Sequence, residues 1–384
     1  MLRILFGLVF SGSLHLYVWS RATDVLELSR RRRRILGAFV LLMMLSVPLT
    51  TSARLWAPEL ASILSWISLP WLAFVGLATV ALLASDLPRF IAWLGRKIRR
   101  QPETAGLSRR EFLSRVTGGA ALAVAGASVG RGVLEARGDH EIVTVEVPLA
   151  KLPKALDGFS IVQLSDLHTG MTIDKAFVQR VVDRANALSP DLLALTGDLV
   201  DGPVASLEGD VAPLAQLRAP HGVFAVTGNH EYYCGVDEWI AAITKLGVRY
   251  LRNERVTISR DGAAFDLAGV DDHSAYQWLG HGEDIPKAIA GRDPSRALVL
   301  LAHQPRQVRH AIEHGVDLQL SGHTHGGQIW PWHYIVKVQQ GGLLAGSYDV
   351  DGTKLYVTRG CGYWGPPVRL LAPLEITRII LRSA

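Results

Sequence analysis

The sequence predicts an α/β domain that is preceded by a region of three to four membrane-spanning helices. Three observations support this fold class. Strand-length apolar runs in the second half of the chain each end in histidine, aspartate or asparagine. The first part contains apolar stretches that are long enough to cross a bilayer. The two parts also differ in charge, so we expect residues 1–138 to form the membrane region and residues 139–384 the α/β domain.

Two of the apolar runs lead into acidic residues. FSIVQLS at 159–165 is followed by Asp166 and His168, which lie two positions apart and therefore point to one side of an extended backbone. DLLALT at 191–196 is followed by Gly197, which permits a tight turn, and by Asp198. A carboxylate has two oxygens, so Asp198 can bridge two metal ions.

The later runs end in the same residue types: Asn229 and His230 after 222–228, His303 after 296–302, and His323 with His325 after 316–322. A single histidine or aspartate at a strand end is usually a hydrogen-bonded turn residue. Several consecutive strand ends with such residues are hard to explain by turn chemistry. Together they supply the imidazole nitrogens and carboxylate oxygens that a pair of divalent transition metals requires.

The blocks D-x-H, G-D-x-x-D, G-N-H-E, a lone histidine and G-H-x-H closely resemble the calcineurin-like metallophosphoesterase superfamily. The resemblance covers residues 142–382. It implies a four-layer sandwich of two mixed β-sheets flanked by helices. It also implies a two-metal centre at the ends of the strands, occupied by two divalent ions for which Mn, Fe, Zn, Co and Ni are all candidates.

The resemblance assigns roles by position. One metal would be held by Asp166, His168 and His325, the other by Asn229, His303 and His323, with Asp198 between them. His230 would bind no metal and would act on the phosphate as a general acid or a transition-state stabiliser. We expect Asp201 and Glu231 to order the neighbouring loops without binding metal.

The membrane region is expected to contain spans at 4–20, 35–53 and 61–85, and a weaker Gly/Ala-rich span at 116–134. The first three have roughly 17 to 25 residues each, and a helix of about 20 residues crosses a hydrocarbon core of about 30 Å. Arginine-dense connections between these stretches favour membrane insertion over burial in a soluble core.

Charge distribution predicts an orientation. Residues 1–138 contain 18 Lys and Arg against 7 Asp and Glu, whereas residues 139–384 contain 22 against 28. The basic residues fall in two loops: Arg21 with 30–34, and Arg89, Arg96, Lys97, Arg99, Arg100, Arg109, Arg110 and Arg115. By the positive-inside tendency both loops are cytoplasmic, the N-terminus is outside, and the catalytic domain of this inner-membrane protein is extracytoplasmic. The acidic domain argues against nucleic acid as a partner.

The segment 108–134 adds a second indication of export. It begins SRREFL and continues into a mildly apolar stretch, which resembles a twin-arginine signal at an internal position. The alternative is a basic stop before a helix. Export is the favoured interpretation, because the Arg-Arg-x-Phe-Leu pattern and the low hydrophobicity of the next segment occur together. Cleavage after the small residues 123–127 is one outcome of export, and retention as a fourth anchor is the favoured one.

The chain most resembles the membrane-anchored branch of the superfamily. The turn at 322–328 continues into IWPWHYIV, and TRGCGYWGPPVR at 358–369 is similar to the closing loop of that branch. We expect an aromatic rim beside the metals that suits an acyl chain or the bilayer interface. Its residues are Trp330, Trp332, Tyr334 and Trp364.

The sequence thus predicts a membrane-anchored phosphoesterase that hydrolyses phosphodiester or pyrophosphate bonds, with a lipid-linked ester as the favoured substrate. Two alternatives stay open. One is a broad-specificity phosphodiesterase or phosphomonoesterase acting on soluble substrates, and the other is a metal-dependent membrane sensor without turnover. Cys234 and Cys361 are the only cysteines. Whether they form a disulfide is open as well.

Overall fold

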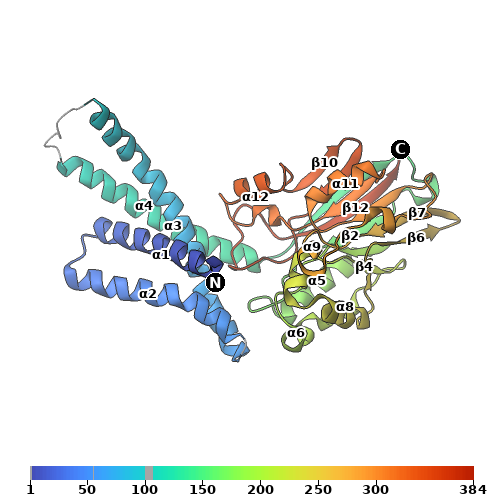
Figure 1. The fold of residues 1–384 in the computed structure, drawn as a ribbon, viewed down its shortest axis with the longest axis horizontal. Coiled ribbons are helices and arrows are strands. Elements are labelled where there is room, and N and C mark those ends of the chain that lie inside the picture. Colours follow the sequence, from blue (N-terminus) through green and yellow to red (C-terminus); the bar gives the residue numbers. More distant parts are fainter. Residues whose placement is uncertain (1, 55, 100–106) are drawn as a thin grey trace. The chain divides into compact units, whose positions relative to one another are not determined.

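The computed structural model describes residues 2–54, 56–99 and 107–384. The chain divides into two compact units, one that extends to Leu134 and one that runs from Glu135 to the C-terminus apart from residues 365–368 (Figure 1). Each unit is considered by itself. The expected domain boundary after residue 138 stays a prediction.

The first unit is helical. Its four helices are α1 (Leu2–Val25), α2 (Arg30–Ala53), α3 (Pro58–Ile98) and α4 (Leu107–Arg137). Helices α1, α2 and α3 pack against one another. Helix α3 is 41 residues long and contains Pro70 and Pro88. It therefore exceeds the roughly 20 residues that a hydrocarbon core requires.

Three helical segments of the described chain are long and apolar enough to span a membrane: Arg30–Ala53, Pro58–Ile98 and Glu111–Arg137. Large apolar side chains on these segments face outward, including Leu42, Ile63 and Val124, each at least 60% exposed. Such side chains suit lipid rather than water. The span expected at 4–20 lies within α1, which is not one of these three. The side chains of residues 2–6 and 8 lie outside those described.

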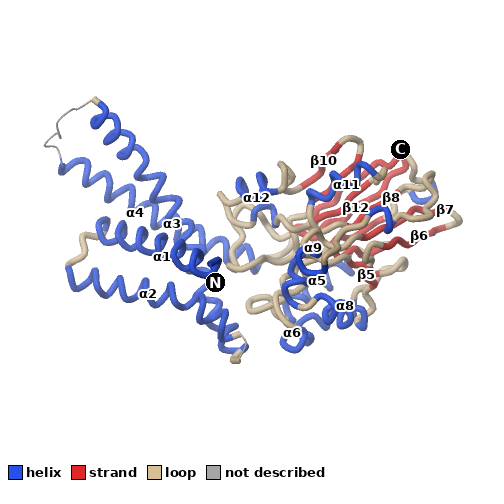
Figure 2. The backbone as a smooth tube through the Cα atoms, in the orientation of Figure 1, coloured by secondary structure: helices blue, strands red, loops and turns tan. Residues whose placement is uncertain are grey.

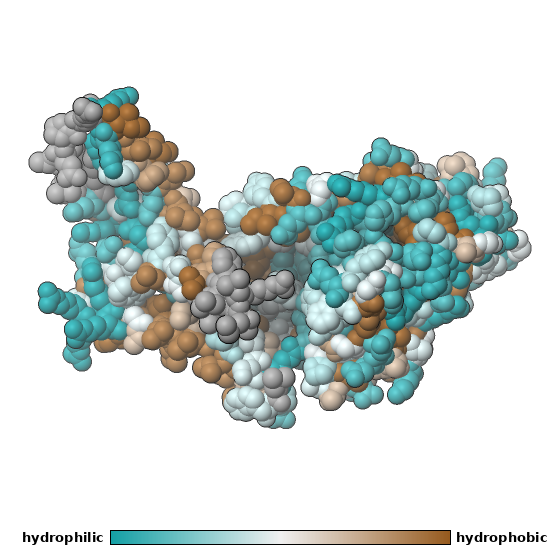
Figure 3. Space-filling model, viewed as in Figure 1, coloured by the Kyte–Doolittle hydropathy of each residue, from teal (hydrophilic) through white to brown (hydrophobic). Residues whose placement is uncertain are grey.

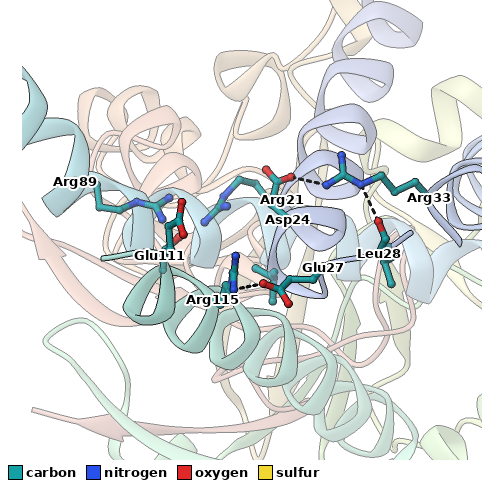
Figure 4. Close-up of a pocket in the computed structure, with 10 residues that line it drawn as sticks. Arg21, Asp24, Glu27, Leu28, Arg33, Arg89, Glu111 and Arg115 are labelled. Atoms are coloured by element: carbon teal, nitrogen blue, oxygen red, sulfur yellow. Dashed lines mark hydrogen bonds and ion pairs between the residues drawn. The ribbon is translucent and has the colours of Figure 1, made fainter. Parts of the chain in front are cut away.

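Charged side chains from all four helices line a cavity in this unit (Figure 4). Asp86 accepts hydrogen bonds from Arg21, at 2.8 and 2.9 Å, and is paired with Arg89. Arg115 is paired with Glu27. Basic residues of both regions predicted from the sequence therefore line one cavity: Arg21 and Arg33 of the first, and Arg89 and Arg115 of the second. Arg100 of the second region lies outside the described residues.

The second unit contains two six-stranded mixed sheets (Figure 2). The first has the order β1 (Glu141–Leu149), β12 (Glu375–Ser383), β2 (Ser160–Leu164), β3 (Leu192–Leu195), β4 (Val223–Ala225) and β5 (Arg249–Tyr250). The second has the order β10 (Gly346–Val350), β11 (Thr353–Val357), β9 (Leu318–Ser321), β8 (Leu298–Leu301), β7 (Ala263–Gly269) and β6 (Glu254–Arg260).

Parallel pairing brings the ligand-bearing strands together within each sheet. Strands β2, β3, β4 and β5 are mutually parallel, and so are β7, β8, β9 and β11. Antiparallel pairs join β12 to β2, β6 to β7 and β10 to β11. The carboxyl ends of adjacent parallel strands lie at one edge of a sheet, so residues that follow them are neighbours.

Alternating side chains of the buried strands fill two different layers. Ile161 of β2 and Val299 of β8 belong to one apolar cluster between the sheets, which also includes Phe265. The next residue of β2, Val162, packs with the helices on the outer face of the first sheet. Leu300 of β8 likewise packs on the outer face of the second sheet. Burial on both faces explains why apolar residues occur at consecutive positions in these runs.

Helices cover both outer faces. The first sheet is covered by α5 (Lys175–Ala187), α6 (Val204–Val211) and α8 (Val236–Lys245), and the second by α10 (Ile285–Ala288) and α11 (Val308–Glu313). The shorter elements are α7 (Asn229–Cys234), α9 (Ala275–Leu279), α12 (His333–Gln339), η1 (Lys154–Leu156), η2 (Ala212–Gln216), η3 (Pro305–Gln307) and η4 (His325–Gly327). The predicted four-layer sandwich is confirmed, and each predicted strand is present.

Candidate metal centre

The candidate ligands follow five strand ends in the two sheets. Asp166 and His168 follow β2, and Asp198 follows β3. The remaining positions follow β4, β8 and β9: Asn229 and His230, His303, and His323 with His325. The structure therefore brings all eight residues predicted for the site to one edge of the sandwich, where the two sheets meet.

Three overlapping groups of side chains have their nitrogen and oxygen atoms within 4.8 Å of one another: Asp166–His168–His325, His168–Asp198–His230, and Asp198–His303–His323. The distance from His168 Nε2 to His325 Nε2 is 3.0 Å. His303 Nε2 lies 3.1 Å from Asp198 Oδ2. Asp198 lies between the first and the third group, because its Oδ2 atom is 3.7 Å from His168 Nε2 of the first and 3.1 Å from His303 Nε2 of the third.

The backbone is strained at five of these positions. Asp166, His168, Asp198, His323 and His325 all have positive φ, between 52° and 71°. This conformation costs a residue other than glycine on the order of 1 kcal/mol or more. Neighbouring strands hold it in place, because the Asp166 N–H donates to the Gly197 carbonyl and the His168 N–H to the Asp198 carbonyl, both at 3.0 Å. Strain concentrated in this way is typical of a functional site.

Two glycines allow the loops to approach the carboxylates. A Cβ atom on Gly228 would lie 2.2 Å from Asp198 Oδ1, and one on Gly322 would lie 2.3 Å from Asp166 Oδ2. No other residue fits at these positions without a shift of the carboxylate. The glycines of the G-N-H-E and G-H-x-H blocks are thus required by the packing around the candidate ligands.

Asn229 carries a buried acceptor that the described residues leave unsatisfied. Its Oδ1 atom has no hydrogen-bond partner in the part of the chain that the structure describes. An unpaired buried carbonyl oxygen costs about 1–3 kcal/mol. A cation at the group that contains Asp198, His303 and His323 would satisfy this oxygen, so Asn229 fits the expected ligand set.

Burial and mutual attraction set the protonation of the cluster. Burial raises the pKa of Asp166. It lowers the pKa of His323 to about 3 and that of His325 below its ordinary value, so both imidazoles are neutral and able to bind a metal. Burial by itself raises the pKa of Asp198. The attraction of nearby histidines, chiefly His303, outweighs burial, so the pKa of Asp198 is lowered.

His230 is held as a cation. Burial lowers its pKa, but the charge of Asp198 and the hydrogen bond to Asp201 outweigh burial and raise the pKa to about 9. The backbone N–H of His230 donates to Asp198 Oδ1 at 2.8 Å. Because the ring is protonated near neutral pH, it can donate a proton or a hydrogen bond to a bound anion.

Asp201 connects His230 to His168. Its Oδ1 atom lies 2.6 Å from His230 Nδ1 and 2.9 Å from His168 Nδ1. A carboxylate that accepts from Nδ1 leaves the Nε2 atom of His168 free to bind a metal. Glu231 has a comparable supporting place, because it accepts the backbone N–H groups of Asp198, Leu199 and Gly228. Neither carboxylate lies among the three groups.

Arg369 supports the site in a way that the sequence did not reveal. Its guanidinium is fully buried and donates to the backbone carbonyls of His325, Arg359, Gly362 and Ala372. Burial lowers its pKa to about 10. Arg369 therefore fixes the turn that carries His325 against the closing loop. An arginine between apolar neighbours in VRLL is the only sequence signal for this role.

Aromatic side chains surround His230. The ring centroid of Tyr233 lies 5.1 Å from that of His230, and Trp364 packs edge-on at 6.0 Å. Trp278 lies 6.0 Å from Tyr233. Trp364 belongs to the expected aromatic rim, whereas Tyr233 and Trp278 were not anticipated. The other rim residues are exposed on the segment that follows the ligand turn: Trp330, Trp332 and Tyr334.

The two cysteines are not joined by a disulfide in the structure. Cys361 is buried, and its Sγ atom lies 3.2 Å from the Glu375 carbonyl. Burial raises the pKa of the Cys361 thiol to about 12. Cys234 lies in α7 with its Sγ atom 3.9 Å from the Val200 carbonyl. The pairing that the sequence left open is therefore absent.

Comparisons with known proteins agree with this geometry. Residues 159–327 match the family described as calcineurin-like phosphoesterase. A cattle protein named "Transmembrane protein with metallophosphoesterase domain" is 41% identical over 66% of this chain and 60% of its own length. The chain thus spans about 60% of this relative.

Bacterial relatives are matched over more of their length. A metallophosphoesterase of Aquifex aeolicus is 38% identical over 61% of this chain and 88% of its own length. One of Bacillus subtilis is 33% identical over 72% of this chain and 98% of its own length. With its sandwich, its strand-end cluster and these relatives, the chain belongs to the calcineurin-like metallophosphoesterase family.

Proposed function

We propose that this chain is a membrane-anchored phosphoesterase that uses two divalent cations to hydrolyse phosphodiester or pyrophosphate bonds. The observation that carries the proposal is the position of Asp198, whose Oδ2 atom lies 3.7 Å from His168 Nε2 and 3.1 Å from His303 Nε2. One cation would be held by Asp166, His168 and His325. The other would be held by Asn229, His303 and His323, with Asp198 in contact with both.

The donor set supports this assignment. The imidazole nitrogens, the buried carboxylates and one unsatisfied amide oxygen are suitable ligands for Mn, Fe, Zn, Co or Ni. Two bound cations would neutralise the charge on the phosphoryl oxygens and activate water for in-line attack.

Removing the cations should abolish hydrolysis of a chromogenic phosphodiester, and manganese should restore it. A protein that binds manganese yet hydrolyses no ester would instead be a sensor.

His230 supplies the remaining chemistry. Its protonated ring faces the cluster, and Asp201 fixes its orientation through Nδ1. The free Nε2–H can then donate to the leaving-group oxygen or to a phosphoryl oxygen. A proton given to the leaving oxygen makes departure of an alkoxide unnecessary, which matters most for alcohols of high pKa.

The surroundings of His230 favour an apolar leaving group. Tyr233 and Trp364 are each more than half exposed beside this ring. They offer apolar faces to the part of the substrate that departs. We therefore propose a lipid-linked ester as the substrate. Higher turnover with detergent-dispersed phospholipid or glycolipid esters than with nucleotide and sugar-nucleotide esters would support this choice, and the reverse order would exclude it.

The His230→Ala variant separates proton transfer from metal binding. We expect close to two metals per chain to remain, while turnover falls by about 10² to 10⁴, the usual effect of losing a general acid. The defect should be smaller on p-nitrophenyl esters, whose leaving group requires little protonation, than on alkyl esters. His281→Ala, at an exposed histidine, is the matched control. Loss of metal from His230→Ala would show that His230 is itself a ligand.

The Asp201→Asn variant tests the supporting carboxylate. Because Asp201 orients His168, we expect the affinity for manganese to fall by about 10- to 100-fold, as for other outer-shell carboxylates. Calorimetric titration of the metal-free protein measures this. Turnover should stay low at saturating manganese, because His230 loses the same partner. Asp261→Asn, in the exposed β6–β7 turn, should change neither quantity. An unchanged affinity for manganese in the Asp201→Asn variant would show that Asp201 does not orient His168 for metal binding.

The orientation of the catalytic unit is testable with fusions. We propose that it is extracytoplasmic, on the inner membrane, because the basic regions meet at one place in the helical unit. A reporter that folds only outside the cytoplasm should be active after Ala384. Replacing Arg109 and Arg110 by Lys should reduce export if the twin-arginine route is used, whereas Lys at Arg96 and Arg99 should not. Activity of a cytoplasm-only reporter at Ala384 would reverse the orientation.

A further inference from the structure

A group of large apolar side chains is exposed next to the metal-ligand turn. We call it the aromatic patch, and it consists of Trp330, Trp332, Tyr334, Ile335, Val338, Trp364 and Leu371. The exposed fractions range from 37% for Trp332 to 80% for Val338. Helix α12, which supplies three of these residues, contains no buried residue at all.

The patch residues come from two chain segments, 330–338 and 364–371, and hydrogen bonds join these segments. Gln328 Nε2 donates to the Trp364 carbonyl at 2.8 Å, and the Trp364 N–H donates to Gln328 Oε1 at 2.9 Å. The Leu370 N–H donates to the Gln328 carbonyl, and the Trp330 N–H to the Leu370 carbonyl. The patch is therefore contiguous rather than a set of scattered side chains, and apolar residues gather over α12 in Figure 3.

The composition of the patch favours a bilayer interface over a protein partner. Tryptophan and tyrosine have an apolar ring and a polar edge, and they concentrate at the level of lipid headgroups. A contiguous apolar surface of this kind would promote aggregation if it faced water. In this chain, membrane-spanning helices keep the catalytic unit near a bilayer, which protects such a surface from water.

Charge supports the same occupant. Residues 328–348 and 359–371 contain no aspartate or glutamate, although residues 139–384 as a whole are acidic. Lys337 lies within the patch, is exposed, and forms no ion pair among the described residues. A lysine near an anionic lipid surface contributes about 1 kcal/mol of attraction. The surface thus avoids repulsion from lipid phosphates and offers them one cation.

We propose that the aromatic patch inserts into the interface of the membrane in which the chain is anchored. The inference goes beyond the proposed hydrolysis and does not depend on turnover. It has a consequence for substrate access, because Trp364 belongs to the patch and also packs against His230. Insertion of the patch places the mouth of the candidate site at the level of the headgroups.

Spin labels on the full-length chain in nanodiscs test this. Val338→Cys places a label on the patch, and Asp261→Cys places the control label at the exposed β6–β7 turn, both combined with Cys234→Ser. Cys361 is buried and should not react. Oxygen partitions into lipid and a nickel chelate into water. We expect the Val338 label to be accessible to oxygen and protected from nickel, and the Asp261 label to show the opposite.

The remaining outcomes overturn the proposal. A Val338 label that matches the control would place the patch in water. A label protected from both reagents would place it under protein, either a second copy, seen as a dipolar coupling between labels, or the helices of the same chain. Replacing Ile335 and Leu371 by Ser should shift the Val338 label toward nickel accessibility without changing turnover on a soluble ester. No shift would show that these side chains do not hold the patch in lipid.

Discussion

The arrangement of the site depends on the burial of Asp198 between two sets of histidines. Its carboxylate is 2% exposed, approaches His303 and His168, and accepts the backbone N–H of His230. So many buried ionisable groups are tolerated only if charges are matched within the cluster. The pKa values of His323 and His325 are lowered, so their ring nitrogens offer lone pairs, and the Oδ1 atom of Asn229 has no hydrogen-bond partner among the described residues. Divalent cations bound there, as we propose, would satisfy these atoms and balance the buried carboxylates.

The two sheets supply the rigidity that this cluster requires. Parallel strands with apolar side chains on both faces fix the points at which five loops begin. The loops after β2, β3 and β9 then adopt left-handed conformations at the candidate ligands, and backbone hydrogen bonds between loops hold them. Asp201, Glu231 and Arg369 bind the histidines or the backbone around them. Catalytic groups placed on rigid elements and oriented by further hydrogen bonds are pre-organised, so little reorganisation is required when a substrate binds.

The ligand-bearing strands of both sheets and the candidate ligands that follow them could be predicted from the sequence, because the strands form recognisable apolar runs. Runs such as FSIVQLS are mostly apolar over the length of a strand, and each is followed by a residue of ligand type. Tyr233 lies three residues after His230 in α7, so its contact with His230 is local and depends on the short helix that follows β4. The position of Trp278 could not be predicted, since it follows no strand and reaches Tyr233 only through the fold. The buried environment of Arg369 is similarly a tertiary property. The span at 4–20 lies in a helix, yet the described residues mark only three helical segments as able to cross a membrane.

The central claim is that Asp198 lies between two cations. Anomalous diffraction from crystals of the manganese-loaded protein tests it directly. The account predicts two peaks roughly 3.5 to 4 Å apart, the separation of a two-metal hydrolytic site. One should lie beside Asp166, His168 and His325, the other beside Asn229, His303 and His323, with the Asp198 carboxylate in contact with both. A single peak, or a second peak away from Asp198, would contradict the account.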